Sequence, residues 1–370
     1  MDSPFPKQST AAIQLSFTRT ISANAITGQR RSQMCSKGSR RMENVSPAEE
    51  SARSGVIIVG SVTADVTTFS HRLPARGETI LGDEFTLVLG GKGANQAVAV
   101  GLAGADAHFV ACVGTDLFHD LIIDGLVAAG VGIDHVRAIE GERTGIAHIR
   151  VDDSGENDIV MVPLANDRLS IAQIDDAFAQ YSARSSVLLT QLEIPSDLSS
   201  YAITRARNEG LTVLLDPAPA IQLDDAVWTN IDIVTPNETE ARILTGVDVT
   251  DTASAAEAGL WFVQRGVGAA VITLASAGAL LVSADEVAFF PVIPVTSVDT
   301  TAAGDSFAGY LSASLAMGMP LHDAIRRAGA AGALTVTKRG ASPSLPHRRD
   351  VDALLAAGAM HTTPSQGSNQ

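Results

Sequence analysis

The chain has 370 residues, enough for one large α/β domain or for two domains with a sizeable core. Its formal net charge of -15, from 41 acidic and 26 basic residues, argues against general nucleic-acid binding, because affinity for phosphate backbones comes mainly from Lys and Arg. No apolar run reaches the roughly 20 residues that a membrane-spanning helix needs. The cysteines, Cys35 and Cys112, give no disulfide framework and fit a reducing compartment. We therefore expect a cytoplasmic protein with neither nucleic-acid nor membrane partners.

The N-terminal segment differs in composition from the rest of the chain. Residues 1–42 are rich in Ser, Thr, Arg and Gln, and Asp2 is their only acid. This composition is typical of an organellar transit peptide, which would make the location organellar. It is equally typical of an unstructured extension or of sequence upstream of a true start at Met42, and together we favour these two alternatives. We expect disorder over 1–54 and over the polar tail, 357–370.

From Val56 onward, apolar β-branched runs alternate with stretches of helical periodicity. The expected strands cover residues 56–60, 107–114, 186–192, 212–219, 232–237, 269–275 and 289–298. The expected helices cover residues 93–105, 119–130, 199–210, 238–246 and 307–319. Strands that are apolar almost throughout and alternate with helices predict an α/β domain with a parallel sheet covered on both faces.

Two segments break this alternation. Residues 71–91 and 144–166 show little helical periodicity, and the second reads as a hairpin that turns at Asp153 to Asn157. Extra strands between α/β units predict a small separate sheet, with strands within about 68–91 and 144–166. Such a sheet can cover an active site and exclude water, and the alternative is an ordinary extension of the main sheet edge.

The stretch "SVDTTAAGDSFAGY" places acids and very small residues in front of an expected helix. Small residues at this junction expose the first backbone N–H groups of the helix, which lack intrahelical partners and lie at the positive end of the helix dipole. Asp305 directly follows Ala302, Ala303 and Gly304. The pattern predicts an anion site with a carboxylate at its edge.

Three further clusters carry polar residues at strand-to-helix junctions. In "GGKGANQA", three glycines around Lys92 let a ligand approach the backbone, although Gln96 excludes a dinucleotide fingerprint and Gly93 excludes a P-loop. A tight turn is the alternative for this motif. "GSVTAD" ends the first expected strand with Asp65, either a polyol-binding carboxylate or a turn cap. "TPNETE" places Asn237 and Glu240 three residues apart, which suits a helix cap or a hydrated Mg²⁺ beside phosphates.

Taken together, these motifs resemble those of the PfkB-like carbohydrate kinase family, and most closely its ribokinase type. The resemblance extends from about Val56 to about Leu355, and the matching motifs occur in the family's order: "GSVTAD", "GGKGANQA", "QLE", "DPAPA", "TPNETE", "DTTAAGDSFAG" and "KRGASPSLP". It implies a ribokinase-like fold over 55–356, with a Rossmann-like, doubly wound, mostly parallel sheet and a β-sheet lid that serves as a homodimer interface. It also implies ATP-dependent phosphorylation of a free pentose, D-ribose first, at the 5-hydroxyl.

The resemblance also implies roles for individual residues. Asp305 resembles the catalytic base that accepts the proton of the sugar hydroxyl, and the backbone of Ala302, Ala303 and Gly304 resembles the anion hole. The sugar-contacting positions are Thr63, Asp65, Gly91, Lys92, Gly93, Asn95, Glu193 and Asp305.

The remaining implied roles concern the nucleotide and metal ions. Asn237 and Glu240 match the pair that organises Mg²⁺ and phosphate. The ATP positions are Asn237, Thr273, Leu274, Ala275, Ser276, Ala277, Gly278, Gly304, Asp305 and Gly329. Those of a K⁺ activator are Asp299, Thr301, Thr335, Lys338, Gly340 and Ser344.

The chain departs from the ribokinase pattern at a few positions. Thr63 replaces the usual Asn, which leaves 2-deoxyribose, another pentose or a nucleoside as alternative substrates. Ala275 replaces a usual Gly, Ala277 replaces a longer residue and Asp216 replaces an Asn. From a different functional class, a non-catalytic sugar-binding regulator is the alternative, although binding alone would not require Asp305, Asn237 and Glu240 together.

Overall fold

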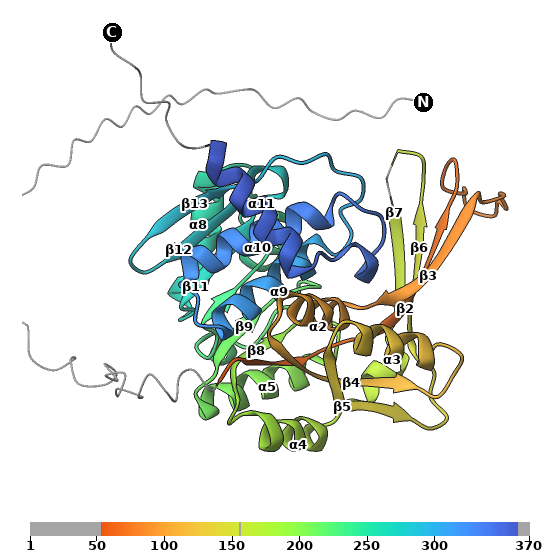
Figure 1. Ribbon diagram of the computed structural model, residues 1–370, viewed down its shortest axis with the longest axis horizontal. Coiled ribbons are helices and arrows are strands. Elements are labelled where there is room, and N and C mark those ends of the chain that lie inside the picture. Colours follow the sequence, from red (N-terminus) through yellow and green to blue (C-terminus); the bar gives the residue numbers. More distant parts are fainter. Residues whose placement is uncertain (1–52, 155–156, 362–370) are drawn as a thin grey trace, which may run out of the picture. The chain divides into compact units, whose positions relative to one another are not determined.

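The computed structural model describes residues 53–361 except 155–156 (Figure 1). Its main element is a nine-stranded sheet with the order β13-β12-β11-β10-β9-β8-β1-β4-β5. All neighbours from β11 to β5 are parallel, whereas β12 and β13 join antiparallel at one edge. The strands are β1 (Gly55–Val59), β4 (Asp106–Gly114), β5 (Val131–Ile139), β8 (Ser185–Thr190), β9 (Thr212–Leu215), β10 (Ile233–Val234), β11 (Ala269–Thr273), β12 (Gly278–Ser283) and β13 (Val287–Pro291).

Helices cover both faces of this sheet, as the strand composition predicted. Val56 and Ile58 of β1 pack into one core, and Ile57 and Val59 pack into the other, because successive side chains of a strand point to opposite faces. The first face carries α2 (Lys92–Ala103), α3 (His119–Ala128), α9 (Ala303–Ala316), α10 (Leu321–Thr335) and α11 (Arg348–His361). The second carries α4 (Ile171–Tyr181), α5 (Ser196–Glu209), α6 (Asp225–Trp228), α7 (Glu238–Thr245) and α8 (Thr252–Gln264).

A second, four-stranded sheet projects from one end of this body (Figure 1). Its order is β3-β2-β6-β7, where β2 and β6 are parallel and the outer pairs are antiparallel. The strands are β2 (Thr63–Phe69), β3 (Glu84–Gly90), β6 (Gly145–Val151) and β7 (Asn157–Val162). Short 3₁₀ turns cover η1 (Leu164–Arg168), η2 (Ala275–Ala277) and η3 (Ser342–Ser344). The predicted fold class, with its small separate sheet, is confirmed.

Several expected boundaries were wrong. The small sheet begins at Thr63 rather than near residue 68, so Asp65 lies inside β2 and not at the end of the first strand. The strand expected over 289–298 ends at Pro291, because Pro291 and Pro294 cannot donate to a ladder. Helix α11 extends through residues 357–361, which were assigned to the tail. The expected extension over 1–54 lies almost entirely outside the described residues, as does the tail beyond His361.

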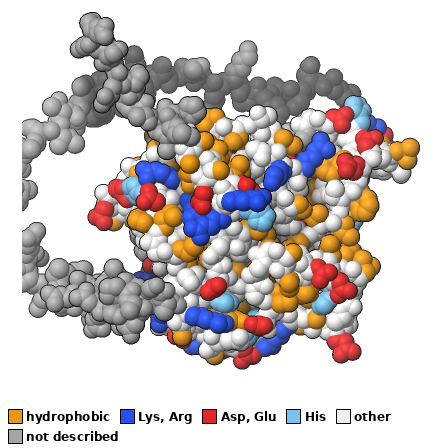
Figure 2. All heavy atoms as spheres, in the orientation of Figure 1, with side chains coloured by type: hydrophobic (Ala, Val, Ile, Leu, Met, Phe, Trp, Pro, Cys, Tyr) orange, Lys and Arg blue, Asp and Glu red, His pale blue; other side chains and the backbone are white. Residues whose placement is uncertain are grey.

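Acidic and basic side chains are interspersed on the face that Figure 2 shows. Among the described residues, no helix is both long enough and apolar enough to cross a membrane.

Candidate active site

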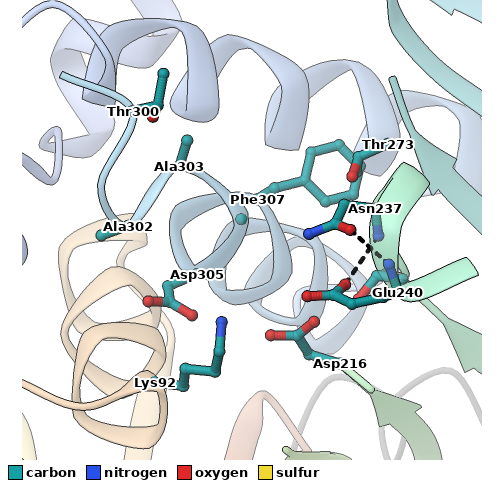
Figure 3. A pocket seen from close by; sticks show the side chains of 12 residues that line it. Lys92, Asp216, Asn237, Glu240, Thr273, Thr300, Ala302, Ala303, Asp305 and Phe307 are labelled. Carbon is teal, nitrogen blue, oxygen red and sulfur yellow. Dashed lines mark hydrogen bonds between the residues drawn. The ribbon is translucent and has the colours of Figure 1, made fainter. Parts of the chain in front are cut away.

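A pocket of about 210 Å³ opens where three parallel strands end and three helices begin (Figure 3). Strands β9, β10 and β11 lead into it, and the N-termini of α2, α7 and α9 face it. Its lining residues are Lys92, Asp216, Thr235, Asn237, Glu240, Thr273, Thr300, Ala302, Ala303, Gly304, Asp305 and Phe307. This position beyond the carboxyl ends of the strands is where open α/β sheets bind ligands.

The predicted anion site lies at the start of α9. Ala302 caps the helix in the left-handed conformation, with φ 60°, and Asp305 follows in the first turn. A side chain on Gly304 would point into open space, so the small residues leave the first N–H groups of the helix accessible. Asp305 itself is only 6% exposed. The structure therefore places the predicted base and the predicted anion hole at one wall of the pocket.

Two neighbouring amides of α2 hold the Asp305 carboxylate. Asn95 Nδ2 donates to Asp305 Oδ2 at 2.9 Å, and Gln96 Nε2 donates to Asp305 Oδ1 at 3.2 Å. The Asn95 Oδ1 atom is buried without a hydrogen-bond partner among the described residues. A buried amide oxygen that lacks a donor is costly, so a ligand hydroxyl at this point would satisfy it.

Lys92 is surrounded by carboxylates. Burial on its own would lower the pKa of the Lys92 ammonium, but Asp305, Asp216, Glu193 and Glu240 outweigh burial and raise it. Its ammonium group lies between Asp305 and Asp216 in Figure 3. Lys92 is therefore a permanent cation on the floor of the pocket.

Asp65 lies on the small sheet near Glu193 and Asp305, although it does not line the pocket. The Thr63 hydroxyl donates to Asp65 Oδ1 at 2.5 Å, and a side chain at Gly90 would collide with the Asp65 carboxylate. Burial raises the pKa of Asp65 to about 7, the Thr63 hydrogen bond lowers it, and the charges of Glu193 and Asp305 raise it further.

The turn before α2 is fixed by Glu193. Glu193 Oε2 accepts from the Ser61 hydroxyl at 2.6 Å and from the Lys92 backbone N–H at 2.9 Å. Gly91 has a φ of 86°, and a Cβ on Gly93 would lie 2.6 Å from the Ser61 backbone. These glycines are therefore needed for the close approach of two backbone segments, which is the tight turn given as the alternative for this motif. The approach of a ligand to the same backbone stays a prediction.

Asn237 and Glu240 form a complete capping box at the start of α7. Glu240 N–H donates to Asn237 Oδ1 at 2.8 Å, and Asn237 N–H donates to Glu240 Oε2 at 2.9 Å. The helix cap and the phosphate role are compatible, because the capping box leaves the side-chain NH₂ group of Asn237 and the second carboxylate oxygen of Glu240 unused. Burial raises the pKa of Glu240, while its backbone bond to Asn237 and the nearby Lys92 act in the opposite direction.

The predicted nucleotide loop connects β11 to β12. Thr273 ends β11, residues Ala275–Ala277 form η2, and Gly278 opens β12. Ala275 has a φ of 41°, a left-handed conformation that favours glycine, at one of the positions where the sequence departs from the ribokinase pattern. Gly278 has a φ of 128°, and a Cβ there would lie 2.0 Å from the Phe290 carbonyl oxygen. Leu274, Ser276 and Ala277 complete the loop, whereas Gly329 lies in α10.

The residues predicted to hold a monovalent cation lie beside the turn that leads to Asp305. Asp299 Oδ1 accepts from the Thr301 N–H at 2.9 Å, and Asp299 Oδ2 accepts from the Gly340 N–H at 2.8 Å. The Lys338 N–H donates to the Thr335 carbonyl at 3.2 Å. Ser344 is buried in η3. The structure thus joins Asp299, Thr301 and Gly340 directly.

Comparison with known proteins agrees with this geometry. Residues 53–348 match the family described as pfkB family carbohydrate kinase. The chain belongs to that family. It is 38% identical to a ribokinase of Haemophilus influenzae over 298 residues, which are 80% of this chain and 97% of the relative. It is 33% identical to a deoxyribokinase of Salmonella typhi over 294 residues, 79% of this chain and 95% of that relative.

A solved carbohydrate kinase structure shares the fold. A ribokinase of Arabidopsis thaliana complexed with ribose and ATP superposes with a TM-score of 0.75 at 31% identity. The match covers 82% of this chain and 99% of that one. The protein is thus a carbohydrate kinase of the pfkB family, as the motifs predicted.

Gln96 and Asp216 were not predicted as site residues, although they lie beside the predicted ones. Gln96 served only to exclude a dinucleotide fingerprint, yet it contacts Asp305. Asp216 was noted as a departure without a role, yet it lines the pocket and accepts from Gln96 at 2.7 Å. The sequence held one signal for each: Gln96 directly follows Asn95, and Asp216 directly follows the apolar residues of β9.

Proposed function

We propose that this carbohydrate kinase transfers the γ-phosphoryl group of ATP to the 5-hydroxyl of D-ribose. The observation that carries the proposal is the position of Asp305 in the first turn of α9, at the wall of a pocket that also presents Lys92, Asn237 and Glu240. Relatives described as ribokinases support the sugar, and the solved complex with ribose and ATP supports both substrates.

Asp305 acts late in the transfer. The ordinary pKa of an aspartate, about 3.9, lies far below that of an alcohol, so a carboxylate cannot ionise a sugar hydroxyl in advance. The proton passes to Asp305 as the new O–P bond forms, while the bond between the γ-phosphorus and the ADP oxygen breaks. The N–H groups at Ala302, Ala303 and Gly304 and the Lys92 ammonium stabilise the phosphoryl oxygens.

Mg²⁺ fits the acidic side of the pocket. The second oxygen of Glu240 and the Asp216 carboxyl group face the same space, and burial raises the pKa of both groups, that of Asp216 to about 8. A cation at this point would favour their ionised forms. Among the described residues, no group of three His, Cys, Asp or Glu could hold a metal by itself, which agrees with an ion that arrives with phosphate oxygens. Asn237 and Glu240 would hold it, and it would neutralise charge on the phosphates.

K⁺ is the proposed activator at Asp299. Each carboxylate oxygen of Asp299 accepts one backbone N–H and keeps lone-pair capacity for a cation. Thr301, Thr335, Lys338, Gly340 and Ser344 are the further candidates, several of them through backbone carbonyls. Because Asp299 also supports the turn that leads to Asp305, an ion there would stabilise that turn.

Deoxyribose is the second candidate substrate. The Thr63 hydroxyl is engaged with Asp65, and no carboxamide extends from this position toward the sugar. One relative is described as a deoxyribokinase.

A homodimer through the small sheet is also proposed. Side chains of a strand alternate between faces, and the face opposite Asp65 carries Phe85, Val160 and Val162, which are 66%, 63% and 42% exposed. A second copy that covered this face would bury them. Light scattering should give twice the monomer mass for the wild type and the monomer mass for Val160→Glu.

The function is tested by measuring ADP release with ribose, 2-deoxyribose, arabinose, fructose and adenosine, with and without K⁺. Ribose should give the highest kcat/KM. The Asp305→Asn variant should fold normally and lose about 10²- to 10⁴-fold in kcat, the usual contribution of a general base. Wild-type turnover by Asp305→Asn would refute its role. Sugar binding without any turnover would contradict the proposed reaction.

A further inference from the structure

Gln96 is a fully buried polar residue at the centre of the site. It is 0% exposed, and its side chain extends from α2 toward the residues that follow β8 and β9. Gln96 Nε2 donates to Asp216 Oδ2 at 2.7 Å and to Asp305 Oδ1 at 3.2 Å. One amide group therefore joins two carboxylates that come from different elements.

The orientation of this amide is determined by Gln191. Gln191 Nε2 donates to Gln96 Oε1 at 2.5 Å, so the NH₂ group of Gln96 must face the carboxylates. Gln191 follows β8 directly and is itself fully buried, and a side chain at Gly60 would collide with it. Its position is fixed by this packing, because its own Oε1 has no hydrogen-bond partner among the described residues. A flipped Gln96 would oppose its carbonyl oxygen to two carboxylates and its NH₂ group to another NH₂ group.

Asn95 and Gln96 differ in the hydrogen-bonding groups that remain free for a substrate. Gln96 uses its oxygen on Gln191 and its two N–H groups on Asp216 and Asp305. Asn95 holds the other oxygen of Asp305 but keeps a buried, unpartnered Oδ1. Asn95 can therefore exchange contacts when a sugar arrives, whereas Gln96 stays fixed to the protein.

The geometry points to Gln96 as a positioning residue that fixes the Asp305 carboxylate for the attacking hydroxyl, with Gln191 as its orienting partner and Asp216 as its second anchor. This inference rests on the proposed role of Asp305 in sugar phosphorylation. Because Gln96 holds Oδ1 of Asp305, the carboxylate keeps its orientation while Asn95 forms a contact with the sugar. The anchor matters because misplacement of a reacting group by about 1 Å can cost on the order of 10²-fold in rate.

The central experiment replaces Gln96 by Met, which preserves length and removes the hydrogen bonds. The kcat should fall about 10- to 100-fold, while the KM values for sugar and ATP stay within about threefold, because the lost contact acts on the reacting group and not on binding. Gln96→Glu should also lose kcat, since it replaces the donor by an acceptor. Gln173→Met is the matched control, because Gln173 is a buried glutamine with several hydrogen bonds on the far side of the fold. It should lower stability and leave kcat unchanged.

A double-mutant comparison separates positioning from general damage. In the Asp305→Asn background, Gln96→Met should cost less than about twofold in addition, because residues that act as a unit are not additive. A second full loss in the double mutant, or a Gln96→Met enzyme with wild-type kcat, would overturn the inference. If Gln96→Met does not fold, Gln191→Met tests the same point, with kcat expected to fall by about three- to tenfold and an unchanged kcat counting against it. Failure of the proposed function would look different, because the wild type would then turn over no sugar.

Discussion

The Thr63 hydroxyl donates a hydrogen bond of 2.5 Å to Asp65 Oδ1, and both side chains are buried in β2. The proton of the Thr63 hydroxyl is therefore used within the protein, on the carboxylate that is proposed to bind the sugar. We expect the sugar selectivity of this kinase to depend on this contact.

Thr63→Asn should sharpen the selection of ribose. A carboxamide extends further than a hydroxyl and supplies both a donor and an acceptor, so it can meet a sugar hydroxyl that Thr63 does not. The ratio of kcat/KM for ribose over 2-deoxyribose should rise about tenfold, the effect of one net hydrogen bond of about 1.4 kcal/mol. Thr63→Val is the control that removes only the Asp65 contact. An unchanged ratio in Thr63→Asn would show that this position does not select the sugar.

Sugar use should depend on the ionisation of Asp65. Burial raises its pKa to about 7, so the carboxyl group becomes protonated just below neutral pH and then accepts hydroxyl protons less well. The kcat/KM for the sugar should fall as pH drops through about 7 in the wild type. Asp65→Asn should have a low kcat/KM without this acid limb. An acid limb that persists in Asp65→Asn would assign the ionisation to another group.

Stability should respond to His108 in the acid range. His108 stacks on Tyr181, with ring centroids 3.9 Å apart, and burial lowers its pKa to about 4, with Arg184 adding to the effect. Because the unfolded state binds a proton near the ordinary histidine pKa of 6.5 and the folded state only near 4, stability is full above 6.5 and is lost as pH falls toward 4. Urea unfolding at pH 8 and pH 5 should show a smaller loss for His108→Phe than for the wild type. Exposed His148→Phe should behave like the wild type.

Ala275→Gly should stabilise the nucleotide loop. A Cβ at the observed φ of 41° is strained, and Ala275 is exposed, so no packing is lost with the methyl group. The gain should reach about 1 kcal/mol, because strain relief exceeds the added entropy of the unfolded chain. Ala277→Gly in the same loop lacks the left-handed φ and should destabilise. Thermal unfolding of the two variants gives the comparison, and a lower Tm for Ala275→Gly would contradict the strain argument.

Local sequence patterns predicted the fold where periodicity is strong. The parallel strands around Val56 and Val187 and the helix after Asp305 could be predicted because strand and helix periodicities differ clearly. The expectation of a strand up to Val298 was wrong. The apolar residues after Pro291 have the composition of a strand, but they form no ladder of hydrogen bonds with a neighbouring strand. Asp65 was misplaced because "GSV" continues the apolar run after β1, although pairing with β3 and β6 begins only at Thr63.

The site was predictable for residues in motifs and not for those that support them. Asp305 and Asn237 stand at helix starts, where local sequence already implies exposed N–H groups or a cap. The role of Gln96 depends on Gln191 and Asp216, which are separated from it by 95 and 120 positions, and such contacts leave no periodic signal. The roles proposed for the cation positions around Asp299 remain predictions.

Asp65 and Asp305 are carried by different layers of the fold. The first is carried by β2 of the small sheet, and the second by α9 on the main sheet. Because each carboxylate is carried by a different layer, the placement of the small sheet against the main sheet sets the distance between them, and the proposed sugar site depends on both sheets. Substitutions in the small sheet that displace β2 are therefore expected to weaken sugar binding even where they leave the residues around Asp305 unchanged.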